Sequence, residues 1–165
     1  MQFNFLIPAL AALIPLVVGF IWYNPKVLGT AWMQASGMTE EKAKKSNMMI
    51  VFGLTYVFSF FVAVFLMTAT IHQFGLSGLA GGDIASLPEG DFKTHLTALI
   101  ELSKDQFRGF KHGALHGGLC AFMFVLPVLG INAMFEGRGF KYIAINVGYW
   151  FISLMLMGGV VCAYA

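Results

Sequence analysis

The chain has 165 residues, of which 58% are hydrophobic and only 11% are charged, and its mean hydropathy is +0.77. An ordinary soluble domain has about 25% charged residues, so this composition excludes one. The formal net charge of +2 is too small to indicate a nucleic-acid-binding surface. The hydrophobic content also leaves no room for a separate soluble catalytic domain.

Four stretches contain no Asp, Glu, Lys or Arg. They are Met1–Pro25, Ser46–Gly82, His112–Phe135 and Tyr142–Ala165. A helix needs about 20 mostly apolar residues to cross the hydrocarbon core of a bilayer, and each stretch is long enough. The sequence therefore predicts an all-α integral membrane protein, a four-transmembrane-helix bundle with short interfacial helices in loops one and two. We place the spans at about 5–23, 47–71, 112–134 and 142–164, within a single membrane domain, 1–165.

The first connection begins with a helix-start signal at Asn24-Pro25. We predict a surface helix over about 25–36 on the inner face of the membrane, ended by a left-handed Gly37. Trp22, Tyr23 and Trp32 are the expected interface anchors, because amphipathic rings are enriched at headgroup level. After Thr39 the pattern predicts one uninterrupted helix from about Glu40 to His72.

The second connection turns helical after a glycine-rich start. Apolar residues recur at helical spacing from Phe92 to Phe107, with charged residues on the opposite face. This pattern predicts an amphipathic helix over about 91–107. It either covers the outer end of the bundle or docks a partner.

Lys and Arg in the connections predict the orientation of the bundle. The first and third connections carry six, namely Lys26, Lys42, Lys44, Lys45, Arg138 and Lys141. The longer second connection carries four, which are Lys93, Lys104, Arg108 and Lys111. We therefore expect loops one and three in the cytoplasm, with both termini and loop two outside.

Small residues line the start of the third span. Gly109, Gly113 and Gly117 recur every four residues, and Gly118 lies on an adjacent row. This spacing lets two helix backbones approach closely in a membrane. The row predicts helix packing, either within this chain or against another chain.

Two histidines share a face of the same span, since His112 and His116 are four residues apart. His72, at the end of the second span, is expected at a similar depth. Such a set can bind a metal ion, and Glu101, Asp105 and His95 of loop two are within reach as further ligands. The alternatives are histidines hydrogen-bonded near the outer interface, a haem site, or a proton relay. No cofactor is predicted beyond this metal or haem hypothesis.

The remaining sequence shows no catalytic constellation: it has no nucleophile–base pair, no phosphate-binding glycine loop and no set of metal-binding cysteines. We therefore expect a protein that is not an enzyme.

The motifs of the chain resemble those of a bacterial family catalogued as domain of unknown function 1761. The matching segments of the first half are Trp22-Tyr23-Asn24-Pro25, Gly29-Thr-Ala-Trp32-Met33, Gly37, Glu40-Glu41 and Lys44-Lys45. Those of the second half are Phe135-Glu136-Gly137-Arg138, Ile145-Asn146-Val147-Gly148-Tyr149 and Met157-Gly158. The His112-Gly-x-x-His116-Gly form is similar to Bacteroidota-type members. The resemblance implies a four-helix protein of the bacterial inner membrane, and it supplies no catalytic residues.

These observations favour a non-catalytic scaffold or accessory subunit that associates through the third helix. Its expected partners are the lipid bilayer, further copies of the chain or a larger membrane complex. One alternative is a small transporter or channel built from several copies, with kinks at Pro15 and Pro127 opening a path. Another is a metal- or haem-binding membrane protein that uses His72, His112 and His116.

Overall fold

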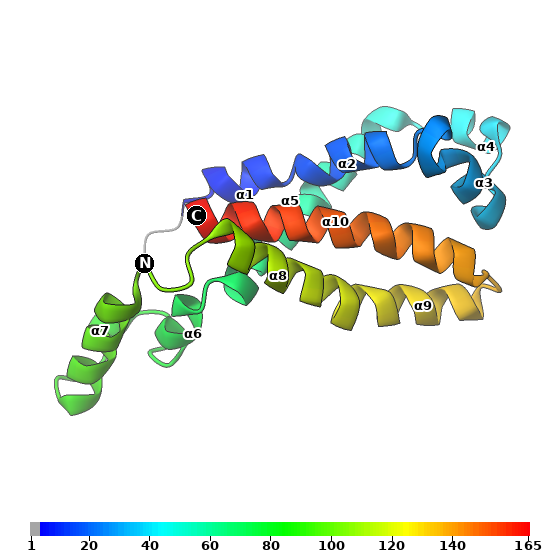
Figure 1. The fold of residues 1–165 in the computed structure, drawn as a ribbon. Helices are drawn as coiled ribbons and strands as arrows, with labels where there is room; N and C mark the ends of the chain where they lie inside the picture. The colour runs from blue at the N-terminus through cyan, green and yellow to red at the C-terminus, as the bar shows by residue number, and fades with distance from the viewer. Residues whose placement is uncertain (1–3) are drawn as a thin grey trace.

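The computed structural model describes residues 4–165, in which every regular element is helical and no strand occurs. Three helices are long and apolar enough to cross a membrane: α5 (Met48–Thr70), the continuous run Phe110–Phe135, and α10 (Phe140–Tyr164). A fourth span results if Leu6–Trp22 and the bent segment after it are counted as one. The predicted all-α membrane fold is confirmed, with the long helices side by side (Figure 1).

The first span is a broken helix, formed by α1 (Leu6–Ala11) and α2 (Ile14–Trp22). The break precedes Pro15, which has no N–H to donate. Other helices bond to the backbone around it. The hydroxyl of Tyr56 donates to an α1 carbonyl at 3.2 Å, and that of Tyr149 donates to the carbonyl of Pro15 at 3.1 Å. The break is thus a point at which α5 and α10 are tied to the first span.

After α2 the chain bends by 56° into the π-helical turn η1 (Pro25–Gly29) and α3 (Thr30–Ser36). The side chain of Asn24 accepts a hydrogen bond from the N–H of Lys26, as a helix cap does. A Cβ at Gly29 would lie 2.2 Å from the carbonyl oxygen of Tyr23, so only glycine fits this turn. Gly37 has a φ of +66° and ends α3 as predicted.

The single helix predicted from Glu40 to His72 is wrong. The structure has two helices there, α4 (Glu40–Lys45) and α5, separated by extended backbone at Ser46 and Asn47. The side chain of Asn47 accepts hydrogen bonds from the N–H groups of Met49 and Ile50 and starts α5 anew. Short polar side chains compete in this way with a continuous helix.

Beyond α5 the chain forms an appendage of three short elements at one end of the bundle (Figure 1), α6 (Gln73–Gly78), η2 (Ile84–Ser86) and α7 (Asp91–Ser103). α7 begins where the amphipathic helix was predicted and ends four residues earlier. The amide of Gln73 is buried, and its nitrogen donates to the carbonyls of Ser103 and Gln106. Figure 1 shows α6 and α7 projecting past the end of the bundle.

The third span is one continuous run of α8 (Phe110–Cys120), η3 (Ala121–Val125) and α9 (Leu126–Phe135). The π-helical turn η3 stands immediately before Pro127, where the regular hydrogen-bond pattern cannot continue. After Gly137, which has a φ of +67°, the chain returns as α10.

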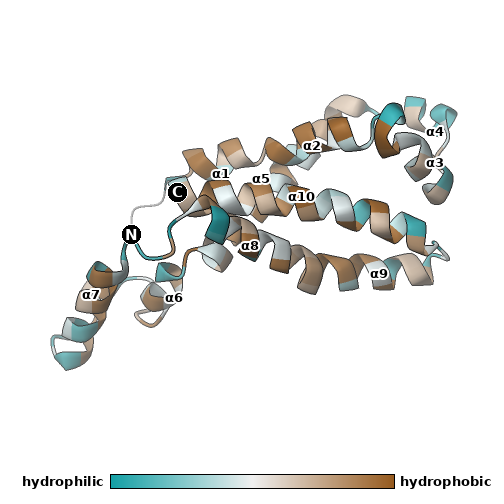
Figure 2. Cartoon of the chain, in the orientation of Figure 1, coloured by the Kyte–Doolittle hydropathy of each residue, from teal (hydrophilic) through white to brown (hydrophobic). Residues whose placement is uncertain are grey.

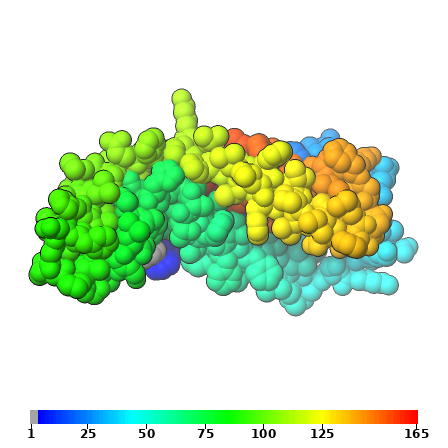
Figure 3. All heavy atoms as spheres, turned by 90° about the horizontal axis from the view of Figure 1, so that it is seen from below, coloured from blue at the N-terminus to red at the C-terminus, as the bar shows by residue number. Residues whose placement is uncertain are grey.

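The bundle has a buried apolar core and also exposes many large apolar side chains. Ala63, Leu66, Met157 and Val161 form part of the core and are fully or nearly fully buried. Large side chains such as Phe20 (79% exposed) point away from it. Figure 2 shows mainly apolar colouring along the long helices, and polar residues mixed with apolar ones on α3, α4 and α7. In Figure 3, α5 and the α8–α9 span lie side by side on one face, with the appendage at one end. This distribution suits a lipid surround.

The end of the bundle near α3 holds a group of hydrogen-bonded side chains that we call the aromatic–amide cluster: Trp22, Tyr23, Asn146 and Tyr149. The indole nitrogen of Trp22 donates to the carbonyl of Ile145 at 3.0 Å, and the hydroxyl of Tyr23 donates to Oδ1 of Asn146 at 3.0 Å. Trp32 packs edge-on against Tyr23. The predicted anchors therefore face α10 or one another, and their depth relative to the headgroups stays a prediction.

Candidate metal centre

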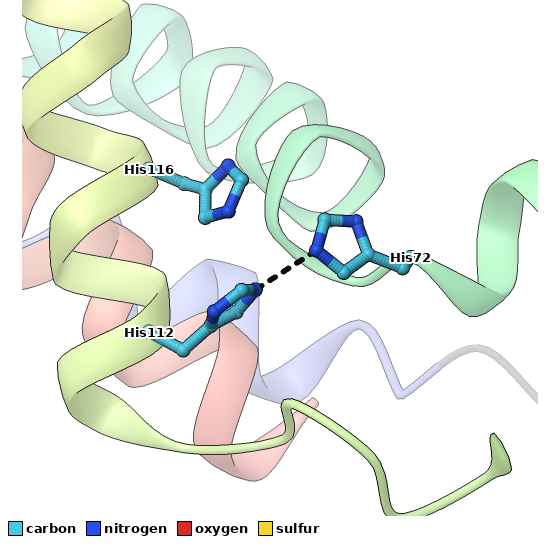
Figure 4. A group of neighbouring side chains, drawn as sticks. All are labelled: His72, His112 and His116. Carbon is cyan, nitrogen blue, oxygen red and sulfur yellow. Dashed lines mark hydrogen bonds between the residues drawn. The ribbon is translucent and has the colours of Figure 1, made fainter.

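Three histidines meet at the other end of the bundle, beside the appendage. His72 follows Ile71, whose extended backbone ends α5, and it stands at the start of α6. His112 and His116 lie one turn apart on α8. Figure 4 shows the three rings turned toward one shared space.

The rings are in mutual contact. Their centroids are 4.9 Å apart for His72 and His112, 5.1 Å for His72 and His116, and 4.4 Å for His112 and His116. One ring nitrogen from each residue lies within 4.8 Å of the other two. A tetrahedral zinc ion with Zn–N bonds of about 2.0–2.1 Å holds its nitrogens roughly 3.3 Å apart. To share one ion, the three nitrogens would have to approach one another from within 4.8 Å to this spacing.

Only two of the three histidines of this cluster are joined by a hydrogen bond. The Nε2 atoms of His72 and His112 are 3.0 Å apart, so one donates to the other. His116 has no hydrogen-bonding partner within residues 4–165. In its neutral form an imidazole has one N–H donor and one nitrogen lone pair, and a single N···N contact joins two of the three rings. A metal cation would use those lone pairs.

The donor set indicates the chemistry of the ion. Three imidazoles and no carboxylate suit zinc, copper or nickel rather than magnesium or calcium. Three protein ligands also leave at least one coordination position open for water or another small ligand. The other ligands considered from the sequence do not join the cluster within the described chain. Glu101 instead pairs with Lys104 at 2.5 Å, and His95 is exposed on α7.

Phe107 is a neighbour of the site that the sequence did not single out. Its φ of +59° lies in the left-handed region, which is costly for a large aromatic residue. Its ring centroid is 5.9 Å from that of His72 and 5.2 Å from that of His112. Its carbonyl accepts a hydrogen bond from the thiol of Cys162 at 3.3 Å. No sequence signal marks a non-glycine residue for this conformation.

The glycines of α8 position the two histidines on that helix. A Cβ at Gly113 would lie 2.1 Å from the carbonyl oxygen of Gly158, and one at Gly117 would lie 2.0 Å from that of Leu154. These glycines therefore bring α8 into backbone contact with α10. Gly118 contacts side chains of α10 more loosely.

Gly109 is not part of this packing. It precedes α8, and a Cβ there would meet nothing within 4 Å. The row of glycines that packs α8 against α10 therefore begins at Gly113 and does not include Gly109, contrary to the prediction from the sequence.

Comparison with known proteins finds one family whose model matches this chain. A model of the family described as protein of unknown function (DUF1761) matches residues 6–162. No curated protein and no solved structure matches the chain. The resemblance seen in the sequence motifs is thus confirmed over nearly the whole chain, which belongs to the DUF1761 family of membrane proteins.

Proposed function

We propose that this protein binds one late transition-metal ion, zinc or copper, through His72, His112 and His116. The observation that supports this function is the convergence of three imidazoles from two separate helices within 4.8 Å. His72 is separated by 40 residues from His112, so local helix periodicity alone does not account for the meeting.

The arrangement supports an ion more than a haem. A haem with two axial imidazoles would have to lie between them, whereas the Nε2 atoms of His72 and His112 are in direct contact. Within the described chain no carboxylate belongs to the cluster to act as a general base. The proposal is therefore binding of the ion itself, with no reaction assigned to the site.

The scaffold and transporter hypotheses receive less support. Association through the third helix was inferred from its glycine row, and Gly113 and Gly117 face α10 of the same chain. At the break near Pro15, the carbonyl of Pro15 accepts a hydrogen bond from the hydroxyl of Tyr149, so the kink does not leave an open path there. An accessory subunit that carries a metal ion stays compatible with the site.

We place the protein in the bacterial inner membrane with the histidine cluster at the outer surface. The family resemblance supports the membrane, and the six cations of loops one and three support the orientation. This placement is tested by introducing single cysteines at residues 83–90 and labelling them in intact cells. Reaction with a reagent that does not cross the membrane is expected, and reaction only after lysis contradicts it.

Metal binding is tested on the full chain purified in detergent, loaded separately with Zn²⁺ and Cu²⁺ and freed of excess ion. We expect one bound ion per chain by elemental analysis. His116→Ala and His72→Ala should weaken binding by more than the roughly 10- to 100-fold that loss of an outer-shell partner costs. His95→Ala is the matched control, because it removes the remaining histidine of the chain.

Two results would overturn the proposal. One is wild-type protein that retains no stoichiometric ion of either kind. The other is equal loss of binding in His95→Ala and His116→Ala, which would indicate non-specific coordination by exposed histidines.

A further inference from the structure

A groove open to the side lies between α2 and α5, at the end of the bundle away from the histidines. It encloses about 490 Å³, within the usual range of ligand sites of about 300–1,000 Å³. Six of its lining residues matter here: Pro15, Gly19, Phe20, Phe52, Thr55 and Tyr149. We call it the lateral groove.

The floor of the lateral groove is buried and its rims are exposed. Pro15 is less than 2% exposed and Tyr149 is 8% exposed, whereas Phe20 is 79% exposed and Phe52 54%. Gly19 has no side chain to fill the space above the ring of Tyr149, which lies 3.4 Å from its Cβ position. The groove is therefore a recess in the surface that the bundle presents to lipid.

The hydroxyl groups that line the groove are already bonded within the protein. The hydroxyl of Tyr149 donates to the carbonyl of Pro15, and that of Thr55 donates to the carbonyl of Val51 at 2.7 Å. The hydroxyl of Tyr23 donates to Asn146. A recess with few free polar partners holds water poorly. At membrane depth the occupant that fits is a hydrocarbon chain.

Two lysines are close in sequence to residues that line the groove. The lining includes Pro25 and Val51. The exposed Lys26 directly follows Pro25, and the exposed Lys45 stands just before the start of α5. Neither lysine forms an ion pair within residues 4–165. Loops one and three together carry six cations and three carboxylates, whereas loop two carries four cations and five carboxylates.

From these observations we propose that the lateral groove binds a glycerophospholipid with an anionic headgroup. One acyl chain lies along Tyr149 and Pro15, and the phosphate lies near Lys26 and Lys45. Cations close to the membrane surface attract anionic headgroups, and the apolar recess holds the chain. This site is independent of the proposed metal centre, which lies at the opposite end of the bundle.

The test uses the full chain reconstituted in vesicles of equimolar dioleoyl phosphatidylglycerol and dioleoyl phosphatidylcholine, then extracted gently for native mass spectrometry. We expect one retained lipid per chain, predominantly phosphatidylglycerol. Thr55→Phe should lower retention by about tenfold, because it displaces methylenes that each contribute roughly fourfold.

Thr68→Phe is the matched control. Thr68 lies on the same helix, is exposed, and its hydroxyl likewise donates to a carbonyl of its own helix, at 2.8 Å. It lies outside the lining of the groove. Equal retention in the two variants would overturn the proposal and indicate ordinary surrounding lipid.

The charge of the headgroup is tested without disturbing the bundle. Lys26→Gln and Lys45→Gln are surface changes, and each should reduce the preference for phosphatidylglycerol over phosphatidylcholine by roughly fivefold. Wild-type protein that retains both lipids equally would contradict an anionic site. Circular dichroism of each variant confirms that the helices are intact.

Discussion

The two ends of the bundle gather polar side chains in different ways. In the aromatic–amide cluster, donors meet acceptors: Trp22 donates to a carbonyl, Tyr23 to an amide oxygen and Tyr149 to the carbonyl of Pro15. At the histidine cluster three groups of one kind meet, and His116 has no hydrogen bond within the described chain.

The difference separates a structural cluster from the cluster that we propose as a binding site. Buried polar groups that satisfy one another stabilise the packing of helices and need no ligand. Three imidazoles that converge with one hydrogen bond among them have ring nitrogens available to a ligand. We therefore expect changes at the first end to lower stability, and changes at the second end to alter what the protein binds.

The largest effect is expected where α8 and α10 connect the two ends. Gly117→Ala places a Cβ 2.0 Å from the carbonyl oxygen of Leu154, and the backbones must separate. We expect a loss of about 3 kcal/mol in the free energy of unfolding, the upper end of the usual range for overpacking. Reversible unfolding in mixed micelles measures it.

Gly53→Ala is the control for that change. Gly53 lies in α5, and a Cβ there would meet nothing within 4 Å. Alanine is a better helix former than glycine by roughly 1 kcal/mol, so this variant should be slightly more stable than the wild type. Equal destabilisation by both substitutions would contradict the close contact of α8 with α10.

The next largest effect is expected when Zn²⁺ is added, because only the histidine cluster should respond to it. Zn²⁺ at about 100 times its dissociation constant should raise the free energy of unfolding by about 2.7 kcal/mol. The increase should vanish in His112→Ala and persist in Tyr149→Phe. Thermal unfolding of the three proteins with and without Zn²⁺ measures this. A similar gain in all three would mean that the ion binds elsewhere.

Gln73 tests whether the outer end also contains purely structural contacts. Gln73→Met removes the amide that donates to the carbonyls of Ser103 and Gln106. Leaving these groups without a partner should cost about 2 kcal/mol, concentrated in α7. Hydrogen exchange should show faster exchange in Asp91–Ser103 and little change in α10. Uniform acceleration throughout the chain would count against a local role.

The smallest effect is expected within the aromatic–amide cluster. Tyr149→Phe removes one hydrogen bond to Pro15 and leaves the ring in place. Hydrogen bonds between membrane helices contribute roughly 0.6 kcal/mol on average, so a loss of this size is expected in micelle unfolding. Metal content should be unchanged. A loss of bound Zn²⁺ would show that the two ends are not independent.

Features that depend on nearby residues were predictable from the sequence. The apolar stretches predicted the long helices, Asn24 and Gly37 predicted the limits of the segment after α2, and four-residue spacing placed His112 and His116 on one face. The amide of Asn47 was the exception. Its competition with a continuous helix was missed, because short polar side chains also occur inside helices without ending them.

The tertiary structure decided which of these residues come into contact with one another. The sequence predicted His72 at a similar depth, but only the packing of α5 beside α8 and the turn after Ile71 bring it within 4.8 Å of the other two imidazoles. It also decided that Gly113 and Gly117 face α10, and that Phe107 takes a left-handed conformation beside the site. Contacts between residues far apart in the chain depend on how whole helices pack, and helix periodicity within one segment carries no information about the facing helix.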